Sequence, residues 1–361
     1  MKKIAVLTSG GDSPGMNAAI RAITKLAASK GVQVHGVLEG YEGLMDGNFR
    51  ELTKVLSDGV VTVDVEVDAA GGQGGTIIGS ARSLRFREAE GRAQANMQMV
   101  KHGLEGLVVI GGNGSLTGAH IFTRESGLPV IGIPGSIDND IGCTALCLGV
   151  DTALNTIVDA CDHISDTARA HRRAFVVEVM GRDCGYLAMA SAIALAADAV
   201  LIREQGKSEE QLIADLSNVI RNGYARGKRR ILIIKAEGVQ VPCTRLVRMT
   251  EESMRADMPN VEIRATVLGH VVRGGNPSYQ DRAIAGRLGF GAVGALLRGL
   301  TDSMAAWMPP VQGGTPTEDS SVQLFSLDRV LTETAAVIDG SSPVTKRRLA
   351  LMEKASGVLA L

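Results

Sequence analysis

Short apolar runs alternate along the chain with longer segments that have helical periodicity. The runs are rich in Val, Ile and Leu and are typical of strands buried on both faces of a sheet. They predict strands at residues 4–7, 32–37, 107–110, 128–133, 174–179 and 231–234. Residues 17–29 and 92–102 have the spacing of helices, which Gly31 and Gly103 would end. The alternation predicts an α/β fold with mainly parallel sheets covered by helices on both faces.

Three of the predicted strands run directly into glycine-rich turns. These turns lie at residues 10–15, 111–115 and 134–140. Ligands of open parallel sheets bind outside the carboxyl ends of the strands, where such turns lie. We therefore expect the three turns to converge on one crevice.

Two further segments differ from this pattern. Residues 309–321 are rich in Pro, Gly, Thr and Ser, which predicts a surface loop or a connection between layers. Residues 324–361 have helical spacing and contain the basic cluster Lys346–Arg348, which we interpret as a solvated helix face.

The composition is that of an ordinary globular protein. The chain has 361 residues, enough for two domains, of which 45% are hydrophobic and 21% charged. The formal net charge of −1 gives no electrostatic case for binding nucleic acid or a membrane. Aromatic residues, at 3%, are too few for platforms on which single-stranded bases stack.

The expected compartment is the cytoplasm. The N-terminus enters a strand pattern almost at once, which no signal peptide fits. The longest apolar stretch, residues 188–202, is interrupted by Ser191 and Asp198 and falls short of the ~20 residues of a membrane span. The five cysteines form no Cys-x-x-Cys pair, so we expect free thiols in a reducing environment.

The turns at residues 10–15 and 111–115 are candidates for binding phosphate. Glycines let the backbone approach a phosphate closely, and the N-terminus of a following helix presents free N–H groups. Neither turn is a Gly-x-Gly-x-x-Gly or a Walker A sequence. A purely structural tight turn remains the alternative for each of them.

Asp138 and Asp140 are the candidates for chemistry. They follow a predicted strand and a glycine turn and are two residues apart. One carboxylate within reach of a hydroxyl can accept its proton as the oxygen attacks phosphorus, and the other can lie near a metal ion. The alternative is a turn in which both carboxylates only cap backbone N–H groups.

Several arginines and one histidine adjoin glycine turns. Arginine carries a rigid fork that matches the geometry of phosphate. Residues of this kind are Arg82, Arg182, His270 and Arg273.

Together these motifs resemble the ATP-dependent 6-phosphofructokinase family. The matching segments keep the family's order and rough spacing, and the resemblance covers about residues 1–300. The segments lie at residues 7–21, 78–82, 111–119, 135–140, 177–188 and 264–275.

The resemblance implies two similar three-layer α/β/α domains with the active site in the cleft between them. A nucleotide-binding domain would comprise residues 1–149 with 272–325, and a sugar-phosphate-binding domain residues 150–271 with 326–361. The implied reaction transfers the γ-phosphoryl group of Mg²⁺-bound ATP to the 1-hydroxyl of fructose 6-phosphate, as in glycolysis. The implied partners are these small molecules and further copies of the chain, which would form at least a dimer and by the family pattern a homotetramer.

The resemblance also assigns roles to individual residues. Asp138 would be the general base, and catalysis would further use Ser136, Arg182 and Gly11. Substrate would be bound by Ser136, Asp138, Asp140, Arg173, Met180, Gly181, Arg182, Glu237, Arg264, His270 and Arg273. Arg173 and Arg264 would reach the substrate of a neighbouring subunit. The nucleotide would be bound by Gly11, Tyr41, Arg82, Ser83, Arg87, Gly112, Asn113, Gly114, Ser115 and Gly118. Asn113 and Asp140 would hold the metal.

Two glycines bear on the phosphoryl donor. Pyrophosphate-using relatives tend to carry aspartate at the position of Gly114 and lysine at that of Gly135. These larger side chains fill the space that the α-phosphate of ATP would occupy. Both positions are glycine here, which favours ATP, and a pyrophosphate-dependent enzyme is the alternative.

Asn113 departs from the family pattern, which normally has aspartate at this position. Asparagine keeps an oxygen ligand but removes the charge that Mg²⁺ prefers. The alternatives that follow are an enzyme with weaker metal or ATP binding and a catalytically weak regulatory homologue.

The resemblance finally implies an allosteric pocket between subunits. Ser165 stands where an arginine is usual in that pocket, and an exposed basic turn is the alternative for residues 226–230. The positions that would keep its positive charge are Arg21, Lys25, Arg226, Lys228 and Arg229.

Overall fold

The chain divides into two compact units in the computed structural model, which describes residues 1–359 and their side chains to residue 355. Residues 360 and 361 lie outside the described residues. They end both the predicted helical segment 324–361 and the second predicted domain. Unit 1 comprises Met1–Ile137, Ile141–Thr152 and Arg273–Ala336. Unit 2 comprises Asp138–Asp140, Ala153–Val272 and the chain from Val337.

Helices and strands alternate in both units. The elements of unit 1 are β1 (Lys3–Ser9), α1 (Met16–Ser29), β2 (Gln33–Val37), α2 (Gly40–Asp46), β3 (Phe49–Glu51), β4 (Thr53–Val55), β5 (Val61–Val63), α3 (Val65–Ala70), the 3-10 helix η1 (Arg85–Arg87), α4 (Ala89–Lys101), β6 (Leu107–Gly111), α5 (Asn113–Ser126), β7 (Val130–Pro134), α10 (Tyr279–Leu297), β12 (Ser303–Trp307), β13 (Thr315–Pro316) and β14 (Val322–Ser326). The elements of unit 2 are β8 (Ala174–Val179), α7 (Tyr186–Ala194), β9 (Ala199–Leu201), η2 (Arg203–Gln205), α8 (Glu209–Ala225), β10 (Ile231–Ala236), α9 (Cys243–Met254), β11 (Ile263–Val267) and α12 (Pro343–Leu359). The segments that run from one unit into the other are α6 (Val150–His171), η3 (Gly269–Arg273) and α11 (Leu327–Asp339).

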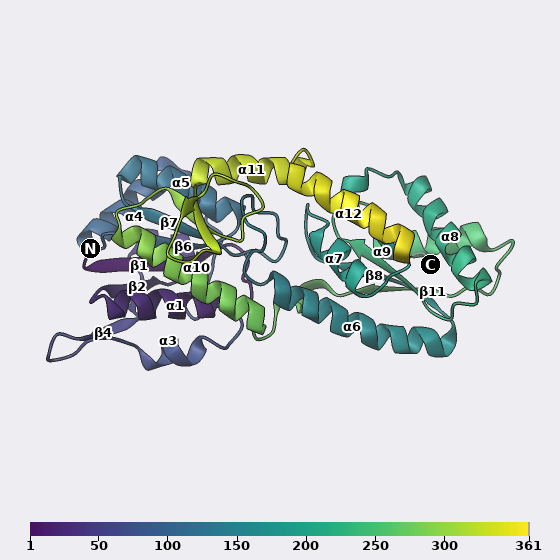
Figure 1. Cartoon of the computed structure of the whole chain (residues 1–361), viewed down its shortest axis with the longest axis horizontal. Helices are drawn as coiled ribbons and strands as arrows, with labels where there is room; N and C mark the ends of the chain where they lie inside the picture. Colours follow the sequence, from purple (N-terminus) through teal and green to yellow (C-terminus); the bar gives the residue numbers. More distant parts are fainter. Residues whose placement is uncertain (360–361) are drawn as a thin grey trace. The chain divides into compact units, whose positions relative to one another are not determined.

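Among the described residues, an eight-stranded sheet forms the centre of unit 1 (Figure 1). Its order is β13-β14-β12-β7-β6-β1-β2-β3, and the strands from β12 to β2 pair in parallel. The strands β3, β13 and β14 extend the sheet by antiparallel pairing. The strand order reverses beside β1, because β2 lies on one side of it and β6 on the other. In open α/β sheets such a reversal marks the ligand crevice at the carboxyl ends of the strands.

Helices cover both faces of this sheet. On one face, Val6 of β1 and Val108 of β6 belong to a core that includes Ile20 of α1 and Leu288 of α10. On the other face, a Cβ added to Gly132 of β7 would lie only 2.5 Å from Cδ2 of Leu116 of α5. The parallel strands are therefore buried on both faces, which explains their nearly continuous apolar sequences.

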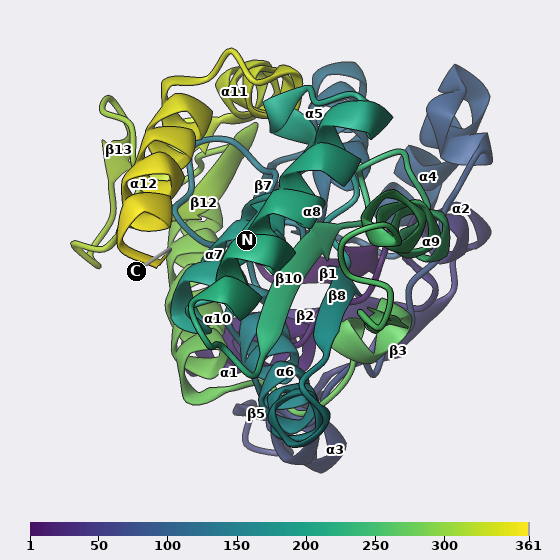
Figure 2. The same cartoon turned by 90° about the vertical axis from the view of Figure 1, so that its right-hand side faces the viewer.

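In the part of unit 2 that the structure describes, four parallel strands form a sheet with the order β11-β8-β10-β9. Figure 2 shows β8 and β10 side by side at its centre. Val176 of β8 and Ile233 of β10 share a buried core with Leu216 of α8 and Leu246 of α9. The helix α7 packs against β10 as well, and Ile234 of β10 is also fully buried.

The structure confirms the strands and helices that the apolar pattern predicted, with one exception at residues 324–326. These residues were expected in a helical segment but belong to β14. Leu324 and Phe325 of β14 pair with β12. This backbone pairing holds them in a strand. From Leu327 the segment forms two helices, α11 and α12, separated by residues 340–342, which are not helical. The predicted loop at 309–321 contains only the short strand β13.

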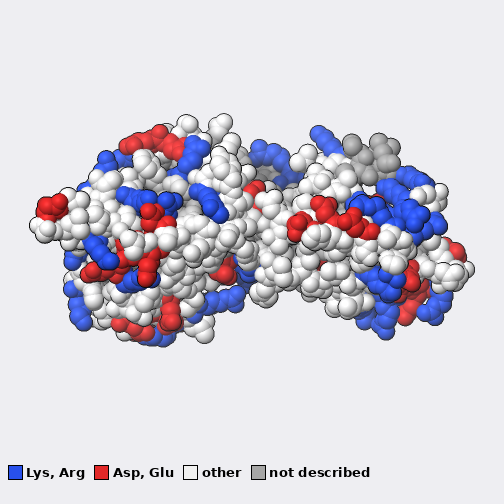
Figure 3. Space-filling view, turned by 90° about the horizontal axis from the view of Figure 1, so that it is seen from below, with Lys and Arg blue, Asp and Glu red and all other residues white. Residues whose placement is uncertain are grey.

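Charges of both signs share the surface. On the face drawn in Figure 3, Lys and Arg side chains are interspersed with Asp and Glu. Many form pairs, such as Arg221 Nε with Asp257 Oδ2 at 2.5 Å and Arg245 Nε with Glu209 Oε1 at 2.7 Å. Through residue 359, the chain contains no helix with the length and apolar character needed to cross a membrane.

All five cysteines lie in the described part of the chain, and all are buried and free of disulfides. Burial raises the pKa of the Cys143 and Cys243 thiols to about 11. It raises the pKa of Cys161 and Cys184 to about 12. These thiols are therefore protonated near neutral pH.

We expect the native protein to react with an aromatic disulfide reagent at pH 8 far more slowly than free cysteine does. The thiolate is the nucleophile, and both the raised pKa and burial withhold it. The absorbance of the released aromatic thiolate measures the rate, and unfolding in guanidinium chloride should expose all five thiols at once. A native thiol that reacts as fast as free cysteine would contradict this burial.

Candidate active site

The first glycine turn links β1 to α1. Gly10 and Gly15 have φ angles of 88° and 101°, in the left-handed region that favours glycine. The hydroxyl of Ser80 donates a hydrogen bond to the Gly10 carbonyl at 2.7 Å. A Cβ added to Gly11 would lie 2.9 Å from Nη1 of Arg273. The structure therefore brings together Gly11 and Arg273, two of the predicted site residues.

The second turn, between β6 and α5, lies beside the first. A Cβ added to Gly10 would lie 3.4 Å from Oγ of Ser115. Gly112 lies beside the third turn, because its added Cβ would be 4.0 Å from Cβ of Ser136. Within unit 1, the first two turns and the start of the third, at residues 135–136, thus lie together at the carboxyl edge of β7, β6 and β1.

The N-terminus of α5 leaves room for an anion. Gly114 is exposed, and a Cβ added to it would have no heavy atom within 4 Å among the described residues, apart from its chain neighbours and the backbone of its own helix. Asn113 is half-buried as the first residue of the helix, and Ser115 is buried. Free N–H groups at a helix N-terminus attract phosphate. At Gly135, by contrast, an added Cβ would lie 3.2 Å from Cε of Met16, so a larger residue would require this side chain to move.

Two predicted nucleotide-binding residues lie beneath this turn. Tyr41 is 3% exposed, burial raises the pKa of its hydroxyl, and that hydroxyl donates to the carbonyl of Ser115 at 2.7 Å. Its ring stacks on Phe86 with a centroid distance of 3.8 Å. A Cβ added to Gly118 would lie 3.2 Å from Cε1 of Phe86, so this glycine makes room for the stacked rings. Their contact with a nucleotide stays a prediction.

The segment that carries Arg82, Ser83 and Arg87 follows a loop tied to β1. The hydroxyl of Thr8 donates to the carbonyl of Gly79 at 2.6 Å. Oγ of Ser83 accepts a hydrogen bond from the backbone N–H of Phe86, in the middle of η1, at 3.0 Å. Both arginines are exposed, so their guanidinium groups can reach a bound anion.

Sequence reasoning missed Asn17, which holds this loop in place. It is buried in α1, and its Nδ2 donates to the carbonyl of Gly74 at 3.1 Å. Its Oδ1 accepts from the N–H of Ile77 at 2.8 Å. An amide side chain on the buried face of a helix, directly after a glycine turn, was the signal in the sequence.

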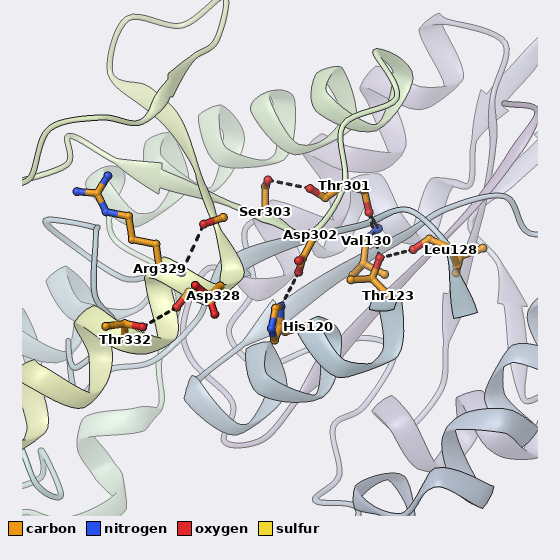
Figure 4. Close-up of polar contacts among 11 residues, drawn as sticks. His120, Thr123, Leu128, Val130, Thr301, Asp302, Ser303, Asp328, Arg329 and Thr332 are labelled. Carbon is orange, nitrogen blue, oxygen red and sulfur yellow. Dashed lines mark hydrogen bonds and ion pairs between the residues drawn. The ribbon is translucent and has the colours of Figure 1, made fainter. Parts of the chain in front are cut away.

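Polar contacts fasten the other end of α5, as Figure 4 shows. Nδ1 of His120 lies 2.7 Å from Oδ1 of Asp302, just before β12. The hydroxyl of Thr123 donates to the carbonyl of Leu128 at 2.6 Å and lies 3.0 Å from the hydroxyl of Thr301. These contacts tie α5 to the residues just before β7 and β12, which fixes the helix that begins at the second turn.

The acidic turn at Asp138–Asp140 is compact. Asp138 is 7% exposed, Asn139 is 1% exposed, and Asp140 is half-buried. Asn139 has a φ of 52°, a left-handed conformation that is uncommon outside glycine but most tolerated by Asn and Asp. The turn therefore places a buried carboxylate next to a strained backbone position. Ser136, two residues before Asp138, is half-buried in unit 1.

In unit 2, candidate substrate residues follow three neighbouring strands. Met180, Gly181 and Arg182 follow β8, Glu237 follows β10, and His270 lies in η3 after β11. Since β11, β8 and β10 are adjacent and parallel, these residues share the carboxyl edge of the sheet.

Glu237 shapes the backbone of the loop after β8. Its Oε1 accepts hydrogen bonds from the N–H groups of Gly181 at 3.1 Å and Arg182 at 2.5 Å. Gly181 has a φ of 143° and Arg182 a φ of 50°, both in the left-handed range. Such conformations persist only where the surroundings hold them, and they are frequent at functional sites. The carboxylate thus presents an exposed Arg182 guanidinium from a fixed backbone.

Arg173 and Arg264 do not join this group. Arg173 immediately precedes β8, and Arg264 is the second residue of β11, so both lie near the amino ends of these parallel strands. Both pair with the carboxylate of Glu262, Arg264 at 3.1 Å. The six residues of β8 span roughly 20 Å and separate them from Arg182.

A buried ion pair lies behind the carboxyl edge of the same sheet. Lys235 of β10 is 1% exposed, and its Nζ donates to Oε2 of Glu178 at 2.9 Å. It also donates to the carbonyls of Ala236 at 3.2 Å and Val239 at 3.1 Å. Lys235 thus bonds both to Glu178 of β8 and to the turn that carries Glu237. The ion pair therefore holds this turn against β8.

The predicted effector charges are engaged in contacts within each unit. Arg21 and Lys25 both pair with Asp68, at 2.5 and 2.9 Å, and line a cavity of about 280 Å³ together with Arg282. In unit 2, Lys228 pairs with Asp198 at 2.7 Å.

The residues of the turn after α8 take different roles. Arg229 Nε donates to the carbonyl of Arg169 at 3.2 Å, and Arg230 Nη1 donates to Oγ of Ser165 at 3.1 Å. The basic turn is therefore packed against α6 rather than only exposed to solvent.

The chain matches the family model for phosphofructokinase over residues 3–296. It is 44% identical to the ATP-dependent 6-phosphofructokinase of Thermotoga petrophila over 338 residues, which cover 94% of this chain and 100% of that protein. It is 43% identical to the ATP-dependent 6-phosphofructokinase 2 of Bacteroides thetaiotaomicron over 297 residues, which cover 82% of this chain and 86% of that protein.

Two solved structures share the fold. Phosphofructokinase from Saccharomyces cerevisiae matches with a TM-score of 0.82 and 33% identity, covering 100% of this chain and 48% of the yeast chain. This chain thus spans about half the length of that one. A pyrophosphate-dependent phosphofructokinase from Marinobacter aquaeolei matches with a TM-score of 0.75 over 91% of this chain and 84% of its own. At 19% identity it shows the fold alone.

Loss of the Glu178 carboxylate should strongly destabilise the protein, because it leaves the buried ammonium group of Lys235 without its counter-charge. For Glu178→Ala we expect the free energy of unfolding to fall by about 3 kcal/mol, measured by urea denaturation. The double variant Glu178→Leu with Lys235→Met should recover most of this loss. The exposed ion pair of Arg221 and Asp257 provides the control, since Asp257→Ala should lower the free energy of unfolding by less than about 1 kcal/mol. Equal losses in Glu178→Ala and Asp257→Ala would contradict the role of burial.

Proposed function

Because the chain belongs to the phosphofructokinase family, we propose that it is an ATP-dependent 6-phosphofructokinase in which Asp138 is the general base. It transfers the γ-phosphoryl group of ATP to the 1-hydroxyl of fructose 6-phosphate, which gives fructose 1,6-bisphosphate and ADP in glycolysis. The observation that carries this function is the 44% identity to a relative of that name along that relative's whole length. The convergence of the predicted phosphate-binding turns at one sheet edge supports it.

Asp138 takes the proton of the sugar hydroxyl. A sugar hydroxyl is a weak nucleophile, and a carboxylate within hydrogen-bond reach accepts its proton as the oxygen attacks phosphorus. The burial of Asp138 holds the carboxylate in one place. In the proposed reaction, the hydroxyl of Ser136 lies near the transferred phosphoryl group. Asp138 contributes by orientation as well as by proton transfer.

Charge on the transferred phosphoryl group is stabilised by Arg182 and by the backbone of Gly11. Preorganised donors contribute most where charge develops in the transition state. The backbone of Arg182 is held by Glu237, and the close approach of Arg273 to Gly11 shows how little space surrounds that backbone.

ATP is bound by unit 1 and the sugar phosphate mainly by unit 2. The N-terminus of α5, with Gly112, Asn113 and Ser115, receives the phosphates of ATP, and the open space at Gly114 leaves room for all three of them. On the sugar side, the side chains of Glu237 and His270 and the backbone of Gly181 are the ligands of unit 2. By the family resemblance, Arg273 is a further ligand.

Mg²⁺ fits the donor set at both predicted positions. It commonly binds through one or two carboxylates together with substrate phosphates and water. Asp140 offers a half-buried carboxylate, and Asn113 an amide oxygen at the N-terminus of α5. When bound, the ion would neutralise charge on the phosphates of ATP.

The active form is a homo-oligomer, at least a dimer and by family pattern a tetramer. The position of Arg173 and Arg264 supports this, because roughly 20 Å of sheet separates them from the substrate residues of their own unit. They are available to a neighbouring copy instead. A cytoplasmic location stays a prediction and agrees with five free thiols.

Asp138→Asn should lower kcat for fructose 6-phosphate and Mg²⁺–ATP by roughly 10²- to 10⁴-fold, because the general base is lost. KM for both substrates should change little. Coupled detection of fructose 1,6-bisphosphate measures the rate, and pyrophosphate in place of ATP should give no turnover. Asp166→Asn, an exposed carboxylate on α6, is the matched control. Wild-type turnover with pyrophosphate, or none with ATP, would overturn the proposal.

Asn113→Asp should lower the Mg²⁺ concentration needed for half-maximal activity by roughly threefold to tenfold. The added carboxylate supplies about 1 kcal/mol of attraction to the metal–nucleotide complex. Titration of activity with Mg²⁺ at saturating fructose 6-phosphate measures the change, and Asn218→Asp on the exposed face of α8 controls for added charge. An unchanged Mg²⁺ requirement would remove Asn113 from the metal site.

A further inference from the structure

The helix α12 reaches the acidic turn through one arginine. Arg348 belongs to the basic cluster that the sequence pattern assigned to a solvated helix face, but only Lys346 and Arg347 of that cluster are exposed. Arg348 is half-buried, and its Nη1 donates to the carbonyl oxygen of Asn139 at 3.4 Å. The expectation for Arg348 was therefore wrong, because helical spacing does not show what covers one side of a terminal helix.

The carbonyl that Arg348 contacts lies at the centre of the turn. Asn139 stands between the proposed base Asp138 and the metal-binding candidate Asp140, and its left-handed φ of 52° is a strained position. A peptide group held at its carbonyl cannot rotate without losing that contact. The direction of this peptide in turn sets where the carboxylates on either side of it point.

One contact holds the side chain of Arg348, and another anchors the helix that carries it. Its guanidinium carbon lies 4.4 Å from the centroid of the Tyr186 ring, at the start of α7. One turn earlier on α12, the buried Thr345 donates through Oγ1 to the carbonyl of Val337 at 3.3 Å. The arginine thus connects the acidic turn to α7, the helix that follows the Met180–Arg182 loop.

Acidic side chains share the surroundings of Arg348. Burial raises the pKa of the nearby Cys184 thiol to about 12; Arg348 opposes this rise, and Glu204 and Asp140 add to it. All three charged groups therefore act on one buried atom. Oε2 of Glu204 has no hydrogen-bond partner among the described residues, and Glu204 lines the same small cavity as Arg348 and Thr345.

We propose that Arg348 is a positioning residue for phosphoryl transfer, which holds the Asp138–Asp140 turn in its reactive conformation through the Asn139 carbonyl. The inference rests on the proposed function, in which Asp138 is the base. Arg348 lies beyond residue 296, where the match to the family model ends. The role therefore follows from the contacts of this chain and gives α12 a part in catalysis.

The test compares four variants in the full-length protein, of which Arg348→Ala removes the side chain beyond Cβ. Arg348→Met keeps the length of the side chain but removes both the charge and the hydrogen-bonding fork. Arg348→Lys keeps the charge and loses the fork. Lys346→Met removes the same charge from an exposed position of the same helix and is the matched control.

We expect Arg348→Met to lower kcat about tenfold or more, because a small misplacement of a reacting group is costly. KM for ATP and for fructose 6-phosphate should remain within about twofold, since substrate contacts are unchanged. Arg348→Lys should fall between this variant and the wild type, and Lys346→Met should match the wild type. Methylguanidinium added to Arg348→Ala should restore part of the lost kcat.

The outcomes separate positioning from a merely structural role. A wild-type kcat in Arg348→Met overturns the inference. A loss of kcat that accompanies a lower Tm of the variants and is not rescued by methylguanidinium also overturns the inference. If the wild-type protein does not turn over fructose 6-phosphate with ATP, the proposed function itself is refuted. If the wild type is active and the Arg348 variants have the same kcat, only the positioning role is refuted.

Discussion

Close backbone packing at the carboxyl edge of the unit 1 sheet is the constraint on which the nucleotide side depends. Parallel pairing of β7, β6 and β1 brings three chain turns to one edge. The turns can approach one another only because side chains are missing where they meet: a Cβ on Gly111 would lie 2.6 Å from the Ser9 carbonyl. What remains is a surface of backbone N–H groups and a helix N-terminus, which suits phosphate. Tyr41 supports the second turn through the Ser115 carbonyl, and Asn17 holds the neighbouring loop at residues 74–77.

Unit 2 differs, because its candidate site residues act mainly through polar and charged side chains rather than through backbone groups. Arg182 extends into solvent from a left-handed backbone position that Glu237 holds by two hydrogen bonds. Behind it, the buried pair of Lys235 and Glu178 fixes the turn that carries Glu237. Each exposed charge is thus supported by a buried polar contact. Rigid support of this kind keeps reorganisation small when charge develops during transfer.

The acidic turn combines a buried carboxylate with a strained backbone. Asp138 is buried as a core residue would be, yet it lies next to a strained peptide whose carbonyl is engaged by an arginine from a helix more than 200 residues later in the chain. Of the two strained positions, Asn139 lies between the proposed base and the metal-binding candidate, and Arg182 is itself a proposed catalytic residue. Strain that the surroundings maintain is a recurrent property of functional sites.

The sequence by itself determined the fold class, the family and the residues of the glycine turns, because buried parallel strands and phosphate-binding turns need residue types that leave a local pattern. It predicted the convergence of the turns, since strand direction alone places carboxyl ends together. Local pattern misassigned residues 324–326 to a helix and Arg348 to a solvated face. It did not identify Asn17, nor that Tyr41 lies under the turn. Those roles depend on which distant segments cover a side chain, and only the tertiary structure decides such contacts.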